Sequence, residues 1–149
     1  MKAREVMVKA PVTLPINATI HEAATVMDTA AVGAVVILDG ERPVGLVTDR
    51  DLVTRALARR LPFDARVDGV MTPGVVCVDA EAELAKVASV LAAHPFRRVP
   101  VVEQDRMVGM VTLDDLIVRL ANDLHSVTTG VAAQLLFGHA EPRPPMTIP

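Results

Sequence analysis

The sequence repeats itself at a spacing of 64 residues, and this repeat limits the possible folds more than any other feature. Residues 6–55 align with residues 70–119 without a gap, and fifteen of the fifty aligned pairs are identical. The stretch "GLVTDRDL" at residues 45–52 returns as "GMVTLDDL" at residues 109–116. A unit of about 60 residues makes only a marginal core alone. Two copies are therefore expected to bury their sheets and helices against each other around a pseudo-twofold axis.

Both copies predict the same order of elements. Each opens with a short apolar strand, followed by a helix with apolar residues at i, i+3, i+4 and i+7. Two strands joined by a polar turn come next, and a second helix begins at Thr48 or Thr112. The predicted fold class is α/β (α+β), a tandem of β-α-β-β-α units. The expected strands are residues 12–14, 34–38 and 44–47 in the first copy and 75–78, 99–102 and 108–111 in the second.

Apolar spacing also predicts which side of each second helix is buried. The expected buried residues are Leu52, Val53, Ala56 and Leu57 in the first copy and Leu116, Ile117, Leu120 and Ala121 in the second. The expected organisation is a first repeat with its linker (1–64), a second repeat (65–122), a C-terminal helix (123–138) and a disordered tail (139–149). Four of the eleven tail residues are proline, which disfavours regular structure.

Composition narrows the class of partner. The net charge is −3 and the basic residues are scattered, so a nucleic acid is not the expected partner. The apolar share of 51% predicts a second buried surface, most simply in a homodimer. No apolar run approaches the roughly 20 residues that cross a bilayer, and no signal peptide is seen. Cys77 is the only cysteine, which excludes an internal disulfide and favours a reducing cytoplasm.

The repeated stretch has two interpretations. As local structure, Thr48 is a helix N-cap and Asp51 stands three residues later, as in a capping box. As a binding site, the helix N-terminus suits a phosphate, and the carboxylate is placed to accept the hydroxyls of a ribose. Gly45 fits a strand that another group approaches closely, and leaves a ligand room. Thr112, Asp115 and Gly109 repeat this arrangement in the second copy.

The chain resembles a tandem pair of CBS (cystathionine β-synthase) domains over about residues 1–122. The resemblance rests on "GLVTDRD" and "GMVTLDD", on the openings "EVMVKAPVTL" and "GVMTPGVVCV", and on "HPFRRVPVV". It implies two clefts for adenosine-containing ligands, and some small proteins of the family are linked to stress responses. The residues that it assigns to the clefts are Thr48, Asp51, Thr112 and Asp115, with Ala34, Val36, Arg98, Pro100, Thr13 and Cys77 as further contacts.

The copies differ in charge near the predicted clefts. His94, Arg97 and Arg98 are available to phosphates in the second copy, whereas the matching stretch "AAVGAVV" has no charge and leaves Arg50 as the nearby cation. We therefore expect the second cleft to hold phosphates better. The histidines lack metal-ligand spacing, so no metal site is predicted, and no nucleophile set predicts an enzyme.

The sequence thus predicts a stand-alone regulatory protein that binds AMP, ADP, ATP, NAD or S-adenosylmethionine, with no required cofactor and an unknown regulated partner. A ligand-free dimeric scaffold that uses the Thr and Asp residues only as helix caps is the alternative.

Overall fold

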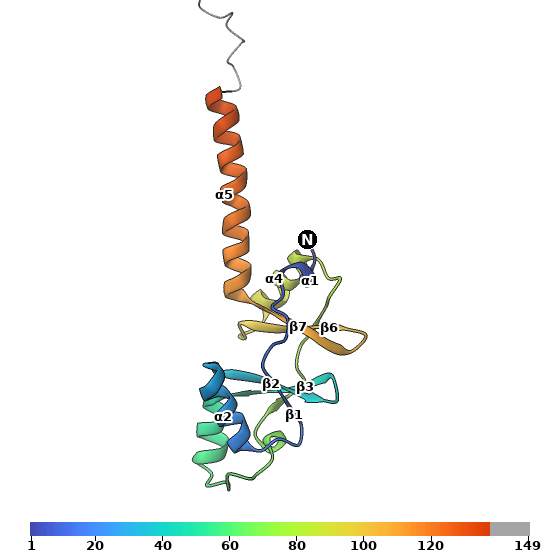
Figure 1. The fold of residues 1–149 in the computed structure, drawn as a ribbon, viewed down its shortest axis with the longest axis vertical. Coiled ribbons are helices and arrows are strands. Elements are labelled where there is room, and N and C mark those ends of the chain that lie inside the picture. Colours follow the sequence, from blue (N-terminus) through green and yellow to red (C-terminus); the bar gives the residue numbers. More distant parts are fainter. Residues whose placement is uncertain (138–149) are drawn as a thin grey trace, which may run out of the picture. The chain divides into compact units, whose positions relative to one another are not determined.

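The computed structural model describes residues 1–137 and divides into two compact units (Figure 1). The first unit, Met1–Leu113, contains both repeats' strands. The second begins at Asp114 and holds most of helix α5 (Leu113–Phe137). No helix among the described residues is long and apolar enough to cross a membrane.

The first sheet has the strand order β1-β2-β3-β4. Strand β1 (Thr13–Pro15) is parallel to β2 (Ala34–Asp39), which is antiparallel to β3 (Arg42–Thr48). The β2–β3 turn contains Gly40 with a φ of 62°, a left-handed conformation that suits glycine. Helix α2 (Ile20–Ala30) begins at a Thr19 cap and buries one side of its surface near β2.

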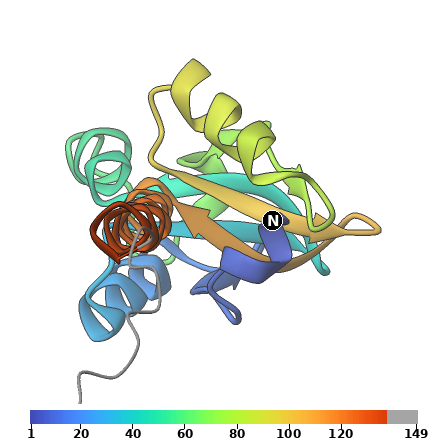
Figure 2. The same ribbon diagram turned by 90° about the horizontal axis from the view of Figure 1, so that it is seen from above.

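The second sheet repeats this arrangement in the order β5-β6-β7. Strand β5 (Val78–Asp79) is parallel to β6 (Arg98–Glu103), which is antiparallel to β7 (Arg106–Thr112). Helix α4 (Leu84–Ala93) contacts β6. Both hairpins carry an irregularity at equivalent positions, after Ile37 and after Val101. Within the first unit the sheets stack, with β3 against β7 (Figures 1 and 2).

Each sheet is completed by a segment that lies next to the other repeat in the sequence. Strand β4 (Thr72–Pro73) follows the linker but pairs with β3, and the preceding turn η2 (Val67–Gly69) inserts Val67 into the first core. The N-terminal helix α1 (Ala3–Val6) contacts β7, where Val8 pairs with Met110. The pairs Val8–Met110 and Thr72–Leu46 are equivalent in the repeat, so the exchange is reciprocal.

Ion pairs hold the N-terminal segment in place. Arg4 contacts both Glu81 and Glu103, and Lys2 contacts Glu81 and Glu83. The backbone N–H of Ala3 donates to the carbonyl of Ala82 at 2.9 Å. These exposed pairs are individually weak. Together with the backbone bonds they fix the first residues to the second repeat.

The second helix of each repeat differs from the prediction. After β3 the chain forms a short α3 (Asp49–Asp51) and then a π-helix η1 (Leu52–Leu57), in which Ala56 is buried. The prediction that Val53 and Leu57 are buried is wrong, since they are 56% and 67% exposed. It is also wrong for Ile117 and Leu120, which are 54% and 50% exposed, and for the exposed Ala121. Apolar spacing marks an apolar side of a helix, but within residues 1–137 of a single chain these side chains remain exposed.

Helix α5 is continuous across the expected boundary at residue 122. It runs from Leu113 to Phe137 without a break at Gly130, so the expected helix at 123–138 extends the last helix of the second repeat. The expected tail, 139–149, lies outside the described residues.

Candidate functional site: a cleft between the two sheets

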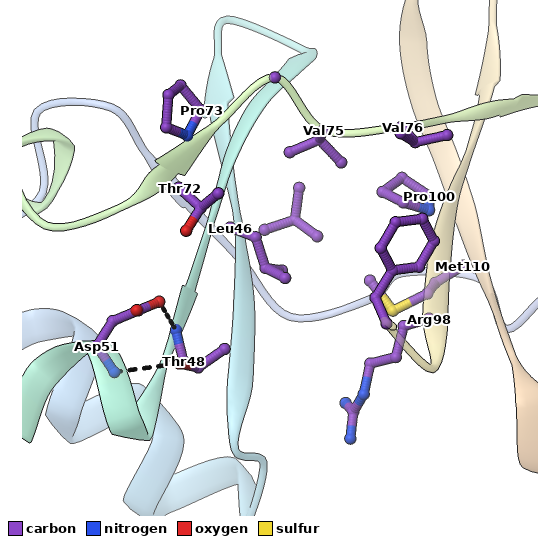
Figure 3. Close-up of a pocket in the computed structure, with 13 residues that line it drawn as sticks. Leu46, Thr48, Asp51, Thr72, Pro73, Val75, Val76, Arg98, Pro100 and Met110 are labelled. Carbon is purple, nitrogen blue, oxygen red and sulfur yellow. Dashed lines mark hydrogen bonds between the residues drawn. The ribbon is translucent and has the colours of Figure 1, made fainter. Parts of the chain in front are cut away.

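A cleft of about 210 Å³ lies inside the first unit (Figure 3). Both repeats and the segment that connects them contribute to it. Its volume is below the roughly 300–1,000 Å³ of typical ligand pockets, so a ligand of drug size would extend beyond it. The lining residues are Val36, Leu46, Thr48, Asp51, Thr72, Pro73, Gly74, Val75, Val76, Phe96, Arg98, Pro100 and Met110.

Thr48 and Asp51 form a complete capping box at one side of the cleft (Figure 3). The backbone N–H of Asp51 donates to Thr48 Oγ1 at 3.1 Å, and the backbone N–H of Thr48 donates to Asp51 Oδ2 at 2.9 Å. The first interpretation of the motif, as a helix cap, is therefore confirmed in the first repeat. The Asp51 side chain is 14% exposed, and its Oδ1 atom takes no part in the capping box.

Arg55 lies beside the second oxygen of Asp51. Its Nε atom is 3.6 Å from Asp51 Oδ1, which is an ion pair but too long for a hydrogen bond. Its Nη1 atom donates to the carbonyl of Val70 and lies at 3.4 Å from Thr72 Oγ1. Asp51 Oδ1 therefore keeps the capacity to accept a hydrogen bond from another group.

Arg98 faces the cleft from the second repeat (Figure 3). This arginine follows the helix of the second copy, and it was therefore expected in the second cleft. In the structure it lines the same cleft as Thr48 and Asp51, together with Pro100 and Met110. The expected lack of a cation in the first cleft, apart from Arg50, is therefore wrong. Because the sheets stack, the second repeat supplies charge to the cleft that contains the first repeat's motif.

The glycines of the motif face methionines. A Cβ atom at Gly45 would lie 2.9 Å from Met71 Cγ and closer still to its sulfur. At Gly109 it would lie 2.5 Å from Met7 Sδ and 2.9 Å from the Val8 carbonyl oxygen. The close approach predicted at these glycines is confirmed, but the approaching group is a packed methionine rather than an opening for a ligand.

Four other predicted residues are not in the cleft lining. Arg50 is exposed on α3, Thr13 pairs with Val36 on the sheet, and Ala34 pairs with Thr48 across the hairpin. Cys77 follows the lining residues Val75 and Val76 and is half-buried. Burial raises the pKa of the Cys77 thiol, and the positive charge of Arg42 opposes this shift.

The second predicted cleft stays a prediction. Thr112 pairs with Arg98 at the end of β7, and the Arg97 carbonyl accepts a hydrogen bond of 2.8 Å from the backbone N–H of Leu113. Asp115 lies in the first turn of α5, which belongs to the second unit.

Sequence reasoning missed the residues that line the cleft from the connecting segment and the hairpins. Thr72 and Val75 were interpreted as the start of the second repeat, although β4 pairs with the first sheet. Phe96 and Met110 are apolar, so their residue types alone do not mark them as binding residues. The repeat did contain a usable signal for this exchange of segments. A glycine in the second hairpin strand and a methionine in the opening segment recur in both copies, and each glycine packs against the methionine of the other copy.

Comparisons with known proteins agree with this architecture. The CBS domain family matches residues 3–58 and 67–122. The CBS domain-containing protein YhcV of Bacillus subtilis is 32% identical over 129 residues, 87% of this chain and 90% of that protein. Hypoxic response protein 1 of Mycobacterium tuberculosis is 34% identical over 116 residues, 76% of this chain and 81% of that protein.

Two solved structures are similar in fold. The crystal structure of Hypoxic Response Protein I with two coordinated zinc ions has a TM-score of 0.72 at 33% identity, covering 78% of this chain and 97% of that one. In this chain no cluster of three metal-ligating side chains occurs among residues 1–137. The CBS domain protein PAE2072 from Pyrobaculum aerophilum, complexed with AMP, has a TM-score of 0.68 at 28% identity, covering 82% and 99%. The chain therefore belongs to the CBS domain family, with two copies of the domain in tandem.

Proposed function

We propose that the cleft at Thr48 and Asp51 binds an adenosine nucleotide, with AMP as the first candidate, and that the chain is a regulatory module rather than an enzyme. The observation that carries this proposal is the placement of Arg98 in the same cleft as the Asp51 carboxylate. One repeat thus offers an acceptor for ribose hydroxyls and the other offers a cation for a phosphate. The AMP complex of the related PAE2072 supports the choice of ligand.

The residues that line the cleft support a separate role for each part of the proposed ligand. Apolar side chains such as Val36, Leu46 and Pro100 suit the faces of an adenine ring. Asp51 Oδ1 accepts a ribose hydroxyl while Oδ2 keeps its capping bond. The phosphate lies toward solvent near Arg98, since the cleft volume is too small for the whole nucleotide.

Such a ligand contacts both repeats at once. Its effect on a partner depends on different affinities for two arrangements of the module. We infer that occupancy favours the arrangement in which Arg98 and Asp51 face the same ligand. The regulated protein that responds to this change binds elsewhere on the module, and the cleft does not identify it.

A ligand-free dimeric scaffold is the second candidate. The observation that favours it is the complete capping box, because Thr48 and Asp51 already satisfy each other's backbone N–H groups. In that case Asp51 contributes to stability alone.

Calorimetric titration with AMP and with adenosine separates the two functions. We expect Asp51→Ala to weaken both ligands about tenfold to a hundredfold, because hydrogen bonds to a charged group contribute roughly 1.5–3 kcal/mol each. Arg98→Met is expected to weaken AMP and leave adenosine unchanged. Arg50→Ala is the matched control, since Arg50 is exposed and outside the cleft lining.

The scaffold predicts another outcome. Wild type would give no binding heat with AMP, and Asp51→Ala would lose about 1 kcal/mol of stability as a cap. Equal losses of AMP affinity in Arg98→Met and Arg50→Ala would contradict the assignment of the phosphate to Arg98.

The assembly and location form part of the same proposal. The exposed apolar residues Val53, Leu57 and Phe63 support a homodimer. A cytoplasmic location is supported by the unpaired thiol of Cys77.

A further inference from the structure

Helix α5 carries an apolar stripe with the spacing of a coiled coil. The stripe consists of Ile117, Leu120, Leu124, Val127 and Val131, which follow one another at alternating steps of three and four residues. This is the a/d pattern of a heptad repeat. All five side chains are between 46% and 64% exposed.

The second half of α5 needs a partner to be stable. Residues 124–137 contain no Asp, Glu, Lys or Arg, so ion pairs along the helix cannot support it. The run 127–131, "VTTGV", has low helix propensity because it joins β-branched residues to a glycine. Thr128 and Thr129 both donate hydrogen bonds to the His125 carbonyl at 2.9 Å. A helix of this composition depends on burying its apolar side.

The chemistry of the stripe selects a second copy of this helix as the occupant. A twofold axis brings identical a and d positions together, so the stripe is complementary to itself. The flanking positions hold Ala121, Asp123, Thr128 and Gly130, and only one of them is charged. Two copies therefore meet without a row of like charges, and the small residues permit close approach. A charged partner would find no opposite charge in residues 124–137.

The position of Gln134 selects the orientation. It follows Val131 by three residues and occupies the next core position. In a parallel, in-register pair the two glutamine side chains face each other and can hydrogen-bond. In an antiparallel pair each would oppose an apolar residue, which is unfavourable for a buried amide. A polar residue at one core position is a known determinant of register.

We propose that the α5 helices of two copies pair as a parallel two-stranded coiled coil along Ile117–Gln134. The CBS domain match ends at residue 122, so the later half of this surface lies outside the family's domain. The inference is independent of the nucleotide cleft and holds whether or not the cleft binds AMP.

Disulfide cross-linking of the full chain tests the pairing directly. In a Cys77→Ala background, Val131→Cys places a thiol at a core position and Thr129→Cys places one on the outer side. We expect mild oxidation to join two chains through Cys at 131 and not at 129, because only the core position brings the two Cβ atoms within disulfide reach. Equal cross-linking at both sites, or none at 131, would overturn the proposal.

A substitution that introduces a charge tests how much the apolar stripe contributes to self-association. Val127→Lys and Thr129→Lys replace β-branched residues two positions apart, one in the stripe and one outside it. By sedimentation, we expect Val127→Lys to weaken self-association more than about tenfold and Thr129→Lys to leave it unchanged, because only the first buries a charge.

Three other outcomes reject the coiled coil, and the first two of them identify a different occupant of the stripe. A monomeric wild type that loses thermal stability in Val127→Lys indicates docking onto the same chain. A monomeric wild type that cosediments with phosphatidylcholine vesicles indicates a membrane surface. Unchanged self-association in Val127→Lys indicates that copies associate through another surface.

Discussion

At the scale of single residues, the repeated motif combines packing and helix capping with the binding role proposed for it. Gly45 and Gly109 leave room for Met71 and Met7. Asp51 closes the helix cap with Oδ2, while its Oδ1 lies beside Arg55 and takes no part in the cap. Both glycines and both aspartates were visible as repeated residues. The residues that pack against them could not be predicted from the sequence. Met71 is 26 residues from Gly45, and no sequence pattern indicates which strand it covers.

The two glycines differ in how strongly an added side chain would disturb the packing around them. At Gly109 a methyl group meets the backbone oxygen of Val8 at 2.9 Å, whereas at Gly45 the three nearest atoms all belong to the flexible side chain of Met71. We expect Gly109→Ala to lower the free energy of unfolding by about 1–3 kcal/mol, and Gly45→Ala by less. Chemical denaturation measures both. Gly69→Ala is the control, since its Cβ would meet nothing within 4 Å, and an equal loss there would contradict the packing argument.

The environment of Cys77 makes a second prediction. Desolvation raises the pKa of this thiol, so a smaller fraction is thiolate at neutral pH than in the unfolded chain. We expect iodoacetamide to alkylate the native protein more slowly than the protein in urea. The difference shrinks as the pH rises through the pKa of the native thiol. A native rate equal to the unfolded rate at pH 7 would show that burial does not protect the sulfur.

At the scale of elements, the sequence predicted the local structure better than its pairing. The hairpin strands agree with the expected ranges within two residues at each end, because apolar runs bounded by polar turns specify strands locally. Strand β4 and the bridge at Val8 were not expected in their places. A two-residue strand is too short for its sequence to determine whether it pairs with the sheet of the preceding repeat or with that of the following repeat. For the same reason Arg98 was assigned to the wrong cleft.

The exchanged segments predict which fragment folds. Residues 9–73 contain the whole first sheet with Val67 and Val70, both fully buried, whereas residues 1–64 lack these valines and β4. Loss of two buried valines removes about 3–6 kcal/mol of burial energy, comparable to the stability of a small domain. We expect only the 9–73 fragment to melt cooperatively when monitored by circular dichroism. A cooperative transition in 1–64 would show that the exchange is dispensable.

At the scale of the whole molecule, the proposed ligand joins the two repeats. The cleft takes Asp51 from one repeat and Arg98 from the other, so binding requires both to be folded. We expect AMP at about 100 times its Kd to stabilise the protein by about 2.7 kcal/mol and to move a single unfolding transition upward. Calorimetric scanning measures this. A split into two transitions, of which AMP moves one, would show that the repeats unfold separately.

The reciprocal exchange of opening segments has a consequence for how such a chain could arise. A chain with one repeat could not complete its own sheet, but two such chains could each lend the other its opening segment, as in a domain-swapped dimer. Gene duplication would then join two polypeptides that already depended on each other. The fusion replaces an encounter in solution by an effective concentration set by the linker, so the module forms at any dilution. Once fused, the copies are free to diverge, as the charges around Arg98 have done, while the interlocked segments keep them inseparable.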